Sequence, residues 1–166
     1  MALNWSLGNT FYHSREYDQA EEQLRKTIQM DPGYPLAHAS LGHVYLEKKM
    51  YAQAVSEYNQ AAALRHDTPE SKALLAVAYA QSGDKIKARS LIEESTAASG
   101  AVSEPLTSVA AGYAALDEKD HAIAALERAY KAHEFVLFFL KVDPRFDSLR
   151  SDPRFQDLLH RIGFPP

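Results

Sequence analysis

The side chains best suited to acid–base or metal chemistry in this sequence are its seven histidines, which are scattered along the chain. His43 and Glu47 are four residues apart and would lie one turn apart on one helix face, with His13 as a third candidate from an earlier segment. A zinc site normally has at least three protein ligands. Because only two of these candidates share a helix, we expect them to form a polar groove wall and no metal site.

Motifs of known catalytic chemistry are absent from the sequence. It contains no His-Glu-x-x-His, no Gly-x-Ser-x-Gly and no glycine-rich phosphate loop. The absence of cysteine removes thiol nucleophiles, thiolate metal ligands and disulfides together. We therefore expect a protein that is not an enzyme and that holds no cofactor.

Composition and charge narrow the class of partner. With 46% hydrophobic and 24% charged residues, the 166-residue chain has the composition of a folded globular protein. The net charge is −4 and no run of five like charges occurs, which disfavours nucleic acid as a partner. The longest apolar run, Phe135–Leu140, is far shorter than the ~20 residues that a membrane-spanning helix needs. No signal-peptide pattern is visible, so we expect a cytoplasmic protein.

A 34-residue period runs through most of the sequence. A shift of 34 residues superposes four aromatic residues, which are Phe11, Tyr45, Tyr79 and Tyr113. The same shift superposes four alanines, which are Ala20, Ala54, Ala88 and Ala122. Bulky residues and then small ones follow in register, at Leu24, Tyr58, Ile92 and Leu126 and at Thr27, Ala61, Ser95 and Ala129. Agreement of several columns at one period indicates stacked structural units.

Each unit is predicted to be a pair of helices. Apolar residues recur at helical spacing in both halves of a unit, and turn residues such as Ser82-Gly83-Asp84 separate the halves. Small residues allow two helices to approach closely. We expect Gly8 and Gly42 in the first helices to face Ala20 and Ala54 in the second ones.

These columns resemble the tetratricopeptide repeat, in which Leu-Gly, an aromatic residue, alanine and a closing proline recur in this order. Leu7-Gly8, Phe11, Ala20 and Pro32 carry the resemblance in the first unit. The resemblance implies an all-α fold: a right-handed helical-repeat solenoid of about four helix hairpins with a C-terminal capping helical segment. The expected units are residues 1–34, 35–68, 69–102 and 103–135, followed by capping helices over 136–166.

The C-terminal segment contains a duplicated tetrapeptide, Asp143-Pro144-Arg145-Phe146 and Asp152-Pro153-Arg154-Phe155. Asp followed by Pro is typical of a helix cap and first helical position, so each copy should begin a short helix with its Phe turned inward. The paired motif also resembles the ending of tetratricopeptide repeats in bacterial multidomain signalling proteins, such as cyclase, Ser/Thr-kinase and transcription-regulator fusions. This resemblance implies the C-terminal docking or regulatory part of a larger protein.

The family resemblance also implies a concave groove lined by the first helix of each unit. Carried onto this sequence, the groove positions are Trp5, Asn9, Tyr12, His13, Ser40, His43, Glu47, Val77 and Gln81. Family members that bind a chaperone's C-terminal carboxylate share lysines, an arginine and asparagines in the groove. This sequence keeps only Asn9 and has Trp5, Ser40, Glu70 and Leu74 at the other positions. We therefore expect no chaperone-tail binding.

Two functions follow from these features. The first is a scaffold or adaptor that binds a peptide or helix of a partner protein in the groove, with Trp5 and Tyr12 as anchors. The competing interpretation is that Trp5 and Tyr12 only cover the exposed end of the first unit. The second function is self-association, as a homodimer that brings signalling domains together, through the apolar run 133–140. Against it stands the expectation that this run packs on the fourth unit beneath the C-terminal segment.

Overall fold

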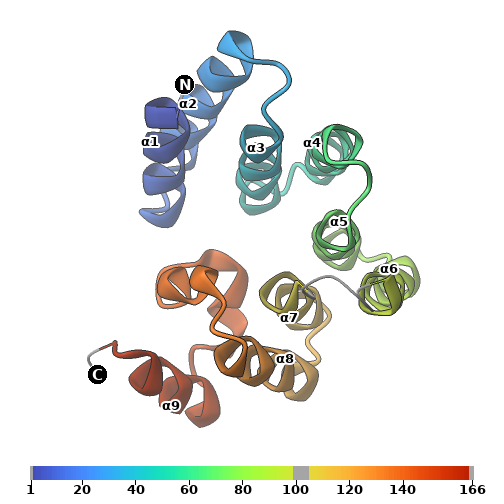
Figure 1. The fold of residues 1–166 in the computed structure, drawn as a ribbon, viewed down its shortest axis with the longest axis vertical. Helices are drawn as coiled ribbons and strands as arrows, with labels where there is room; N and C mark the ends of the chain where they lie inside the picture. Colours follow the sequence, from blue (N-terminus) through green and yellow to red (C-terminus); the bar gives the residue numbers. More distant parts are fainter. Residues whose placement is uncertain (1, 99–104, 165–166) are drawn as a thin grey trace.

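The protein is built from helical hairpins that follow one another along a curved path (Figure 1). The computed structural model describes residues 2–98 and 105–164, and these ranges contain helices and turns but no β-strand. The hairpin helices are α1 (Ala2–His13), α2 (Tyr17–Met30), α3 (Pro35–Glu47), α4 (Tyr51–Leu64), α5 (Pro69–Ser82), α6 (Lys85–Ala98), α7 (Leu106–Ala115) and α8 (Lys119–Lys131). The predicted boundary between the third and fourth units, at 102/103, lies outside the described residues.

The helices form two layers, and the hairpins stack side by side. Within each hairpin the two helices pack together, and neighbouring hairpins meet through α2 and α3, α4 and α5, and α5 and α7. The first helices of the hairpins lie on the inside of the curve and the second helices on the outside (Figure 1). This arrangement is the all-α helical-repeat solenoid that the sequence predicts.

The repeated columns form the core between the layers. The four alanines of the repeat are fully buried, and so are the bulky residues that follow them, with at most 1% of Tyr58 exposed. The glycines make room for those bulky residues: a Cβ on Gly8 would lie 2.8 Å from Leu24 Cγ, and one on Gly42 would lie 2.5 Å from Tyr58 Cε1. The nearest side chains to the glycines are thus Leu24 and Tyr58, while Ala20 also lies opposite Gly8 as predicted, with its carbonyl oxygen 3.6 Å from that Cβ position.

The turn inside each hairpin has the same backbone geometry in all four hairpins. One residue takes a left-handed conformation at intervals of 34 residues: Arg15 (φ 64°), Lys49 (φ 59°), Gly83 (φ 97°) and Asp117 (φ 62°). Only Gly83 adopts this conformation without a Cβ penalty. The turn geometry is therefore the same in all four hairpins, although only one of them has glycine at the left-handed position.

The C-terminal segment comprises η1 (Phe135–Phe139), η2 (Pro144–Leu149) and α9 (Pro153–Ile162). Asp143 and Asp152 accept backbone N–H hydrogen bonds at the starts of η2 and α9, as the duplicated motif predicts. Their phenylalanines, Phe146 and Phe155, are fully buried, with ring centroids 6.4 Å apart. Helix α9 packs against α8, and η2 packs against α7.

The apolar run at η1 is only half buried. Leu137 and Leu140 are inside, but Phe135 is 73% exposed and Phe138 is 61% exposed. The expectation that the whole run packs beneath the C-terminal segment is therefore wrong. In Figure 1 the C-terminal segment instead curves back towards α1, so that the two ends of the chain lie on the same side of the molecule.

Candidate functional site

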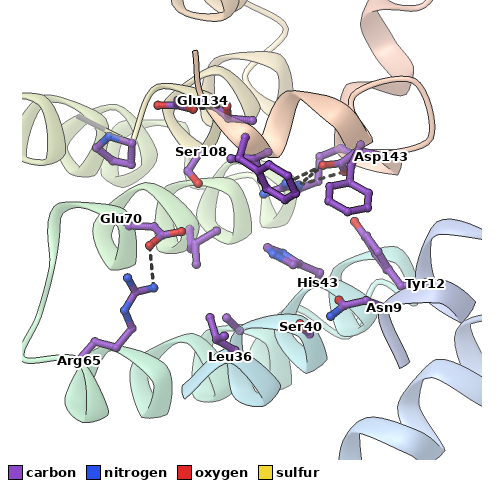
Figure 2. Close-up of a pocket in the computed structure, with 18 of the residues that line it drawn as sticks. Asn9, Tyr12, Leu36, Ser40, His43, Arg65, Glu70, Ser108, Glu134 and Asp143 are labelled. Atoms are coloured by element: carbon purple, nitrogen blue, oxygen red, sulfur yellow. Dashed lines mark hydrogen bonds and ion pairs between the residues drawn. The ribbon is translucent and has the colours of Figure 1, made fainter. Parts of the chain in front are cut away.

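A cavity of about 920 Å³ lies between the inner helices and the C-terminal segment. Residues of α1 and α3 form one wall, α5 and the start of α7 form another, and η1 and η2 complete it (Figure 2). Its volume is at the upper end of the range of small-ligand pockets, ~300–1,000 Å³. The cavity is thus large enough to hold several side chains of a bound segment.

Most of the groove residues implied by the repeat lie on this cavity. Its lining includes Trp5, Asn9, Tyr12, His13, Ser40 and His43. The other three groove residues are not part of the lining. Val77 is buried in the core with 1% of its surface exposed, Glu47 accepts a hydrogen bond from the hydroxyl of Tyr17 (3.4 Å), and Gln81 lies in the last turn of α5.

Trp5 is held in a defined orientation on the cavity wall. Its indole N–H donates a hydrogen bond to the hydroxyl of Ser40 across the α1–α3 boundary, at 3.1 Å. The ring of Tyr34 meets the indole edge to face, with centroids 6.1 Å apart. Because the polar atom of Trp5 already has a partner, its ring offers an apolar surface to the cavity.

A buried ion pair from the first Asp-Pro-Arg-Phe copy forms one end of the cavity. The guanidinium of Arg145 donates to both carboxylate oxygens of Asp143, the shortest contact being 2.6 Å. Only 4% of the Asp143 side chain and 10% of the Arg145 side chain are exposed. Burial alone would raise the pKa of Asp143, but the adjacent guanidinium overrides that effect and holds the pKa below its usual value. The pair is therefore ionised and mutually neutralised.

Neutral rings surround this ion pair. His43 Nδ1 shares a hydrogen bond of 2.7 Å with the hydroxyl of Tyr58. Burial, with a further contribution from the charge of Arg145, lowers the pKa of His43 to about 3. Burial also lowers the pKa of His13. Both imidazoles are therefore uncharged at neutral pH.

Two buried polar atoms beside these rings have no hydrogen-bond partner among the described residues. They are the hydroxyl of Tyr12, whose residue is 2% exposed, and Nδ1 of His13. In Figure 2 the hydroxyl of Tyr12 points from α1 towards the C-terminal segment. Buried polar groups are paired in the great majority of cases, so these two atoms distinguish this end of the cavity from the rest of the core.

The opposite end of the cavity is lined by an ion pair and by further carboxylates. Arg65, just after α4, makes an ion pair of 2.6 Å with Glu70 in the first turn of α5 (Figure 2). Glu134 accepts hydrogen bonds from the backbone N–H groups of Leu106 (3.0 Å) and Thr107 (3.1 Å), and from the Thr107 hydroxyl. A carboxylate at this position satisfies free N–H groups at the start of α7.

Comparison with known proteins supports the repeat assignment for the first part of the chain. The sequence model of one family, described as the tetratricopeptide repeat, matches residues 11–78, from within α1 to within α5. The match covers about two of the four hairpins and agrees with the 34-residue period of the sequence. A solved structure titled "Crystal structure of MamA" is similar at 15% identity and a TM-score of 0.49, over 93% of this chain and 95% of that chain. Among curated proteins, no match to the chain is found.

The stack of hairpins closes on itself through a seam between α1 and the C-terminal segment. Arg15 makes a bidentate ion pair with Asp147, at 2.7 and 2.8 Å. The ring of His13 stacks on that of Phe139, with centroids 5.1 Å apart. We call these two contacts the seam. They convert the open groove that the repeat family implies into a cavity with a wall on every side of the curve.

Sequence reasoning did not find the residues that the C-terminal segment adds to the cavity. Phe139, Asp143 and Arg145 line it, although the sequence predicted capping or self-association for the run that contains Phe139 and capping for the other two. The duplicated motif was a usable signal, because a paired Asp and Arg inside an apolar segment must be neutralised wherever it is buried. No sequence signal links Arg15 to Asp147, which are 132 residues apart.

Residues 2–98 and 105–164 bear on two questions, which are whether side chains could hold a metal ion and whether a helix could cross a membrane. Within these ranges no group of three or more His, Asp or Glu side chains is placed to hold a metal ion, including His43, Glu47 and His13. In the same part of the chain, no helix has both the length and the apolar character to cross a bilayer.

Proposed function

We propose that the protein is a protein–protein interaction module that binds a segment of a partner protein in its central cavity. The observation that carries this proposal is the cavity of about 920 Å³, whose wall brings together aromatic residues of α1 with the C-terminal segment. Buried aromatic anchors are typical of the residues that dominate binding energy at interfaces. The match to the tetratricopeptide repeat supports a binding role, because such helical repeats present extended concave surfaces.

A cavity-filling variant tests this proposal. Ala39 lines the cavity from α3, so Ala39→Phe should fill part of it and abolish partner retention in a pull-down from source-cell lysate. Ala63→Phe places the same ring on the exposed surface of α4 and is the matched control. Fluorescence of Trp5, the only tryptophan, provides a direct readout of occupancy. Equal retention of the same proteins by both variants would contradict binding in the cavity.

Self-association is a second candidate function, and the exposed side chains of η1 favour it. Three exposed apolar side chains lie within four residues: Phe135 is 73% exposed, Val136 is 46% exposed and Phe138 is 61% exposed. Contiguous exposed apolar residues commonly mark interaction sites. Light scattering should then show a dimer for the parent chain and a monomer for Phe135→Ser, Phe138→Ser. A parent that stays monomeric at high concentration would remove this candidate.

The place of the module in a larger protein stays a prediction. It rests on the resemblance of the paired Asp-Pro-Arg-Phe ending to that of cytoplasmic signalling fusions, in which the module would act as a C-terminal adaptor or regulatory part. An antibody against this module should then detect a band well above 18.5 kDa in the source cell. A single band at that mass would contradict it.

A further inference from the structure

We propose that the segment bound in the cavity is an apolar stretch of a partner polypeptide that carries no carboxylate, and not a C-terminal tail or an acidic motif. This inference rests on the proposed function, because it specifies the chemistry of the ligand for the same cavity. Three features of the cavity wall carry it: the state of its charged groups, the character of its apolar surface, and its unpartnered polar atoms.

The two arginines that line the cavity are already paired with carboxylates. Arg145 is paired with Asp143, and Arg65 is paired with Glu70, each with a shortest contact of 2.6 Å. The lining also includes Glu134, which is held by two backbone N–H groups and a hydroxyl, and Asp67, so it carries more carboxylates than cations. A carboxylate on the ligand would lose its hydration without gaining a free cation, unless it broke one of these pairs.

The pairing of both cavity arginines argues specifically against ligands that carry a carboxylate. Recognition of a carboxylate or phosphate generally uses an unpaired Arg or Lys, or free backbone N–H groups. Both cavity arginines are paired, and the N–H groups of Leu106 and Thr107 already donate to Glu134. A C-terminal tail, a fatty acid or an acidic motif would therefore find no unpaired cation among these groups.

The apolar surface is distributed over several walls of the cavity. Trp5 lies on α1, Leu36 on α3, Leu74 on α5, and Val136 and Phe139 on η1. An extended segment has side chains that alternate between opposite directions. Apolar side chains on both sides of such a segment could contact these walls at the same time.

The unpartnered polar atoms favour a polypeptide over a pure hydrocarbon. The hydroxyl of Tyr12 and Nδ1 of His13 are buried without a partner, and burial lowers the pKa of His13 so that its ring is neutral. Neutral donors and acceptors are matched by peptide N–H and C=O groups, which a chain segment carries at every residue, and these would reach the two atoms after a shift of the side chains that cover them. The ligand that satisfies all three features is thus an apolar chain segment.

Selection from a displayed library of random linear peptides tests this inference. The parent, Ala39→Phe and Ala63→Phe serve as baits, and cavity binders are the peptides lost only with Ala39→Phe. We expect these binders to be enriched in Leu, Ile, Val and Phe and depleted in Asp and Glu. Titration of Trp5 fluorescence should give affinities equal within about twofold for free-carboxylate and amidated forms of one peptide. Affinities should change little with salt.

A charge-release variant makes the test sharper. Glu70→Gln leaves Arg65 without its carboxylate partner, so selection with this variant should shift towards peptides with an acidic group. Glu22→Gln also releases a cation, Lys26, but on the exposed face of α2, and should leave the selection unchanged. Circular dichroism and urea unfolding confirm that each bait is folded.

The outcomes separate this inference from the proposed function. Cavity binders enriched in Asp or Glu, or binding about tenfold tighter with a free carboxylate, would overturn the inference and leave peptide binding in place. The same holds if Glu70→Gln changes nothing in the selection. If no peptide is lost with Ala39→Phe, both the proposed function and this inference fail.

Discussion

The two copies of the Asp-Pro-Arg-Phe motif show how one local structure acquires two roles. In both, the aspartate accepts the backbone N–H of the arginine and also pairs with its guanidinium. The first pair is buried against the rings of the first two hairpins. In the second pair 51% of the Arg154 side chain but only 12% of the Asp152 side chain is exposed, and Arg154 also contacts Asp120 on α8 at 2.7 Å. Because the four residues of each copy are identical, the difference in burial comes from the side chains that surround each ion pair.

Removal of the two aspartates should therefore have unequal effects on stability. Asp143→Ala removes a helix cap and leaves the Arg145 charge buried without a partner, which should lower the free energy of unfolding by about 3–5 kcal/mol. Asp152→Ala removes the same cap but leaves Arg154 half exposed and still paired with Asp120, so it should cost less. Urea unfolding of both variants measures the difference. Equal losses would show that Asp143 acts only as a helix cap.

The buried imidazole of His43 should make stability depend on pH. Its pKa is 6.5 when exposed and about 3 in the folded protein, because burial disfavours the charged ring. Between these values the unfolded chain binds a proton that the folded one does not, so this contribution to stability is complete above pH ~6.5 and is lost as the pH falls towards 3. The free energy of unfolding of His43→Gln should fall less over this window.

Two comparisons make the pH experiment specific to His43. Glu47, whose pKa burial raises, is present in the parent and in His43→Gln, so the difference between the two curves isolates the histidine. His160→Gln, at an exposed position on α9, should keep the parent slope. Parallel curves for the parent and His43→Gln would refute the contribution of His43.

At the scale of elements, the close approach of paired helices depends on which side chain lies opposite the glycine. Gly42 on α3 lies against the rigid ring of Tyr58 on α4, whereas Gly112 on α7 lies against the flexible end of Ile92. Alanine favours a helix over glycine by ~1 kcal/mol, so the outcome of a substitution depends on whether the neighbour can move.

Gly42→Ala should destabilise the protein, and Gly112→Ala should have a smaller effect. A Cβ at position 42 would lie 2.5 Å from Tyr58 Cε1, and overpacking of this kind costs about 1–3 kcal/mol. At position 112 the nearest atom is Ile92 Cδ1 at 3.0 Å, which can shift by rotation, and the gain in helix propensity offsets the remainder. Thermal unfolding ranks the two variants, and the reverse order would refute the packing argument.

At the scale of the whole molecule, the seam is the weakest contact that closes the cavity. The Arg15 and Asp147 side chains are 46% and 41% exposed, and an ion pair of this kind contributes about 0.2–1 kcal/mol. The unpartnered polar atoms of Tyr12 and His13 lie on the same side, and such an atom costs about 1–3 kcal/mol. Because these contributions oppose each other, we expect the seam to open more readily than the interfaces between hairpins.

Loss of the seam contacts should make the cavity open. The chain has no cysteine, so Ser14→Cys and Ser148→Cys place spin labels only beside α1 and on η2. Pulsed electron–electron double resonance should give a narrow distribution of label-to-label distances in this background. The distribution should become broader and shift to longer distances in the double variant Arg15→Ala, Phe139→Ala. Lys26→Ala, which removes an exposed ion pair within α2, should have no effect. An unchanged distribution in the seam variant would show that other contacts hold the two ends together.

Much of the architecture was predictable from the sequence because its determinants are local and repeated. Ala54 and Tyr58 lie one helical turn apart, and the 34-residue period places equivalent residues at the same depth in each hairpin. The caps at Asp143 and Asp152 involve only the next two residues. The cavity positions of Trp5 and His43 also agree with the groove that the repeat resemblance implies.

The sequence alone therefore determined the all-α repeat, its hairpin helices and the short helices that follow the Asp-Pro pairs, because each depends on residues within about one repeat length. The tertiary structure alone decided that the C-terminal segment meets α1, that Asp143 and Arg145 become a cavity wall, and that Phe135 stays exposed. These features depend on the small rotation between successive hairpins. That rotation accumulates along the stack, and no single unit encodes the point at which the curve closes.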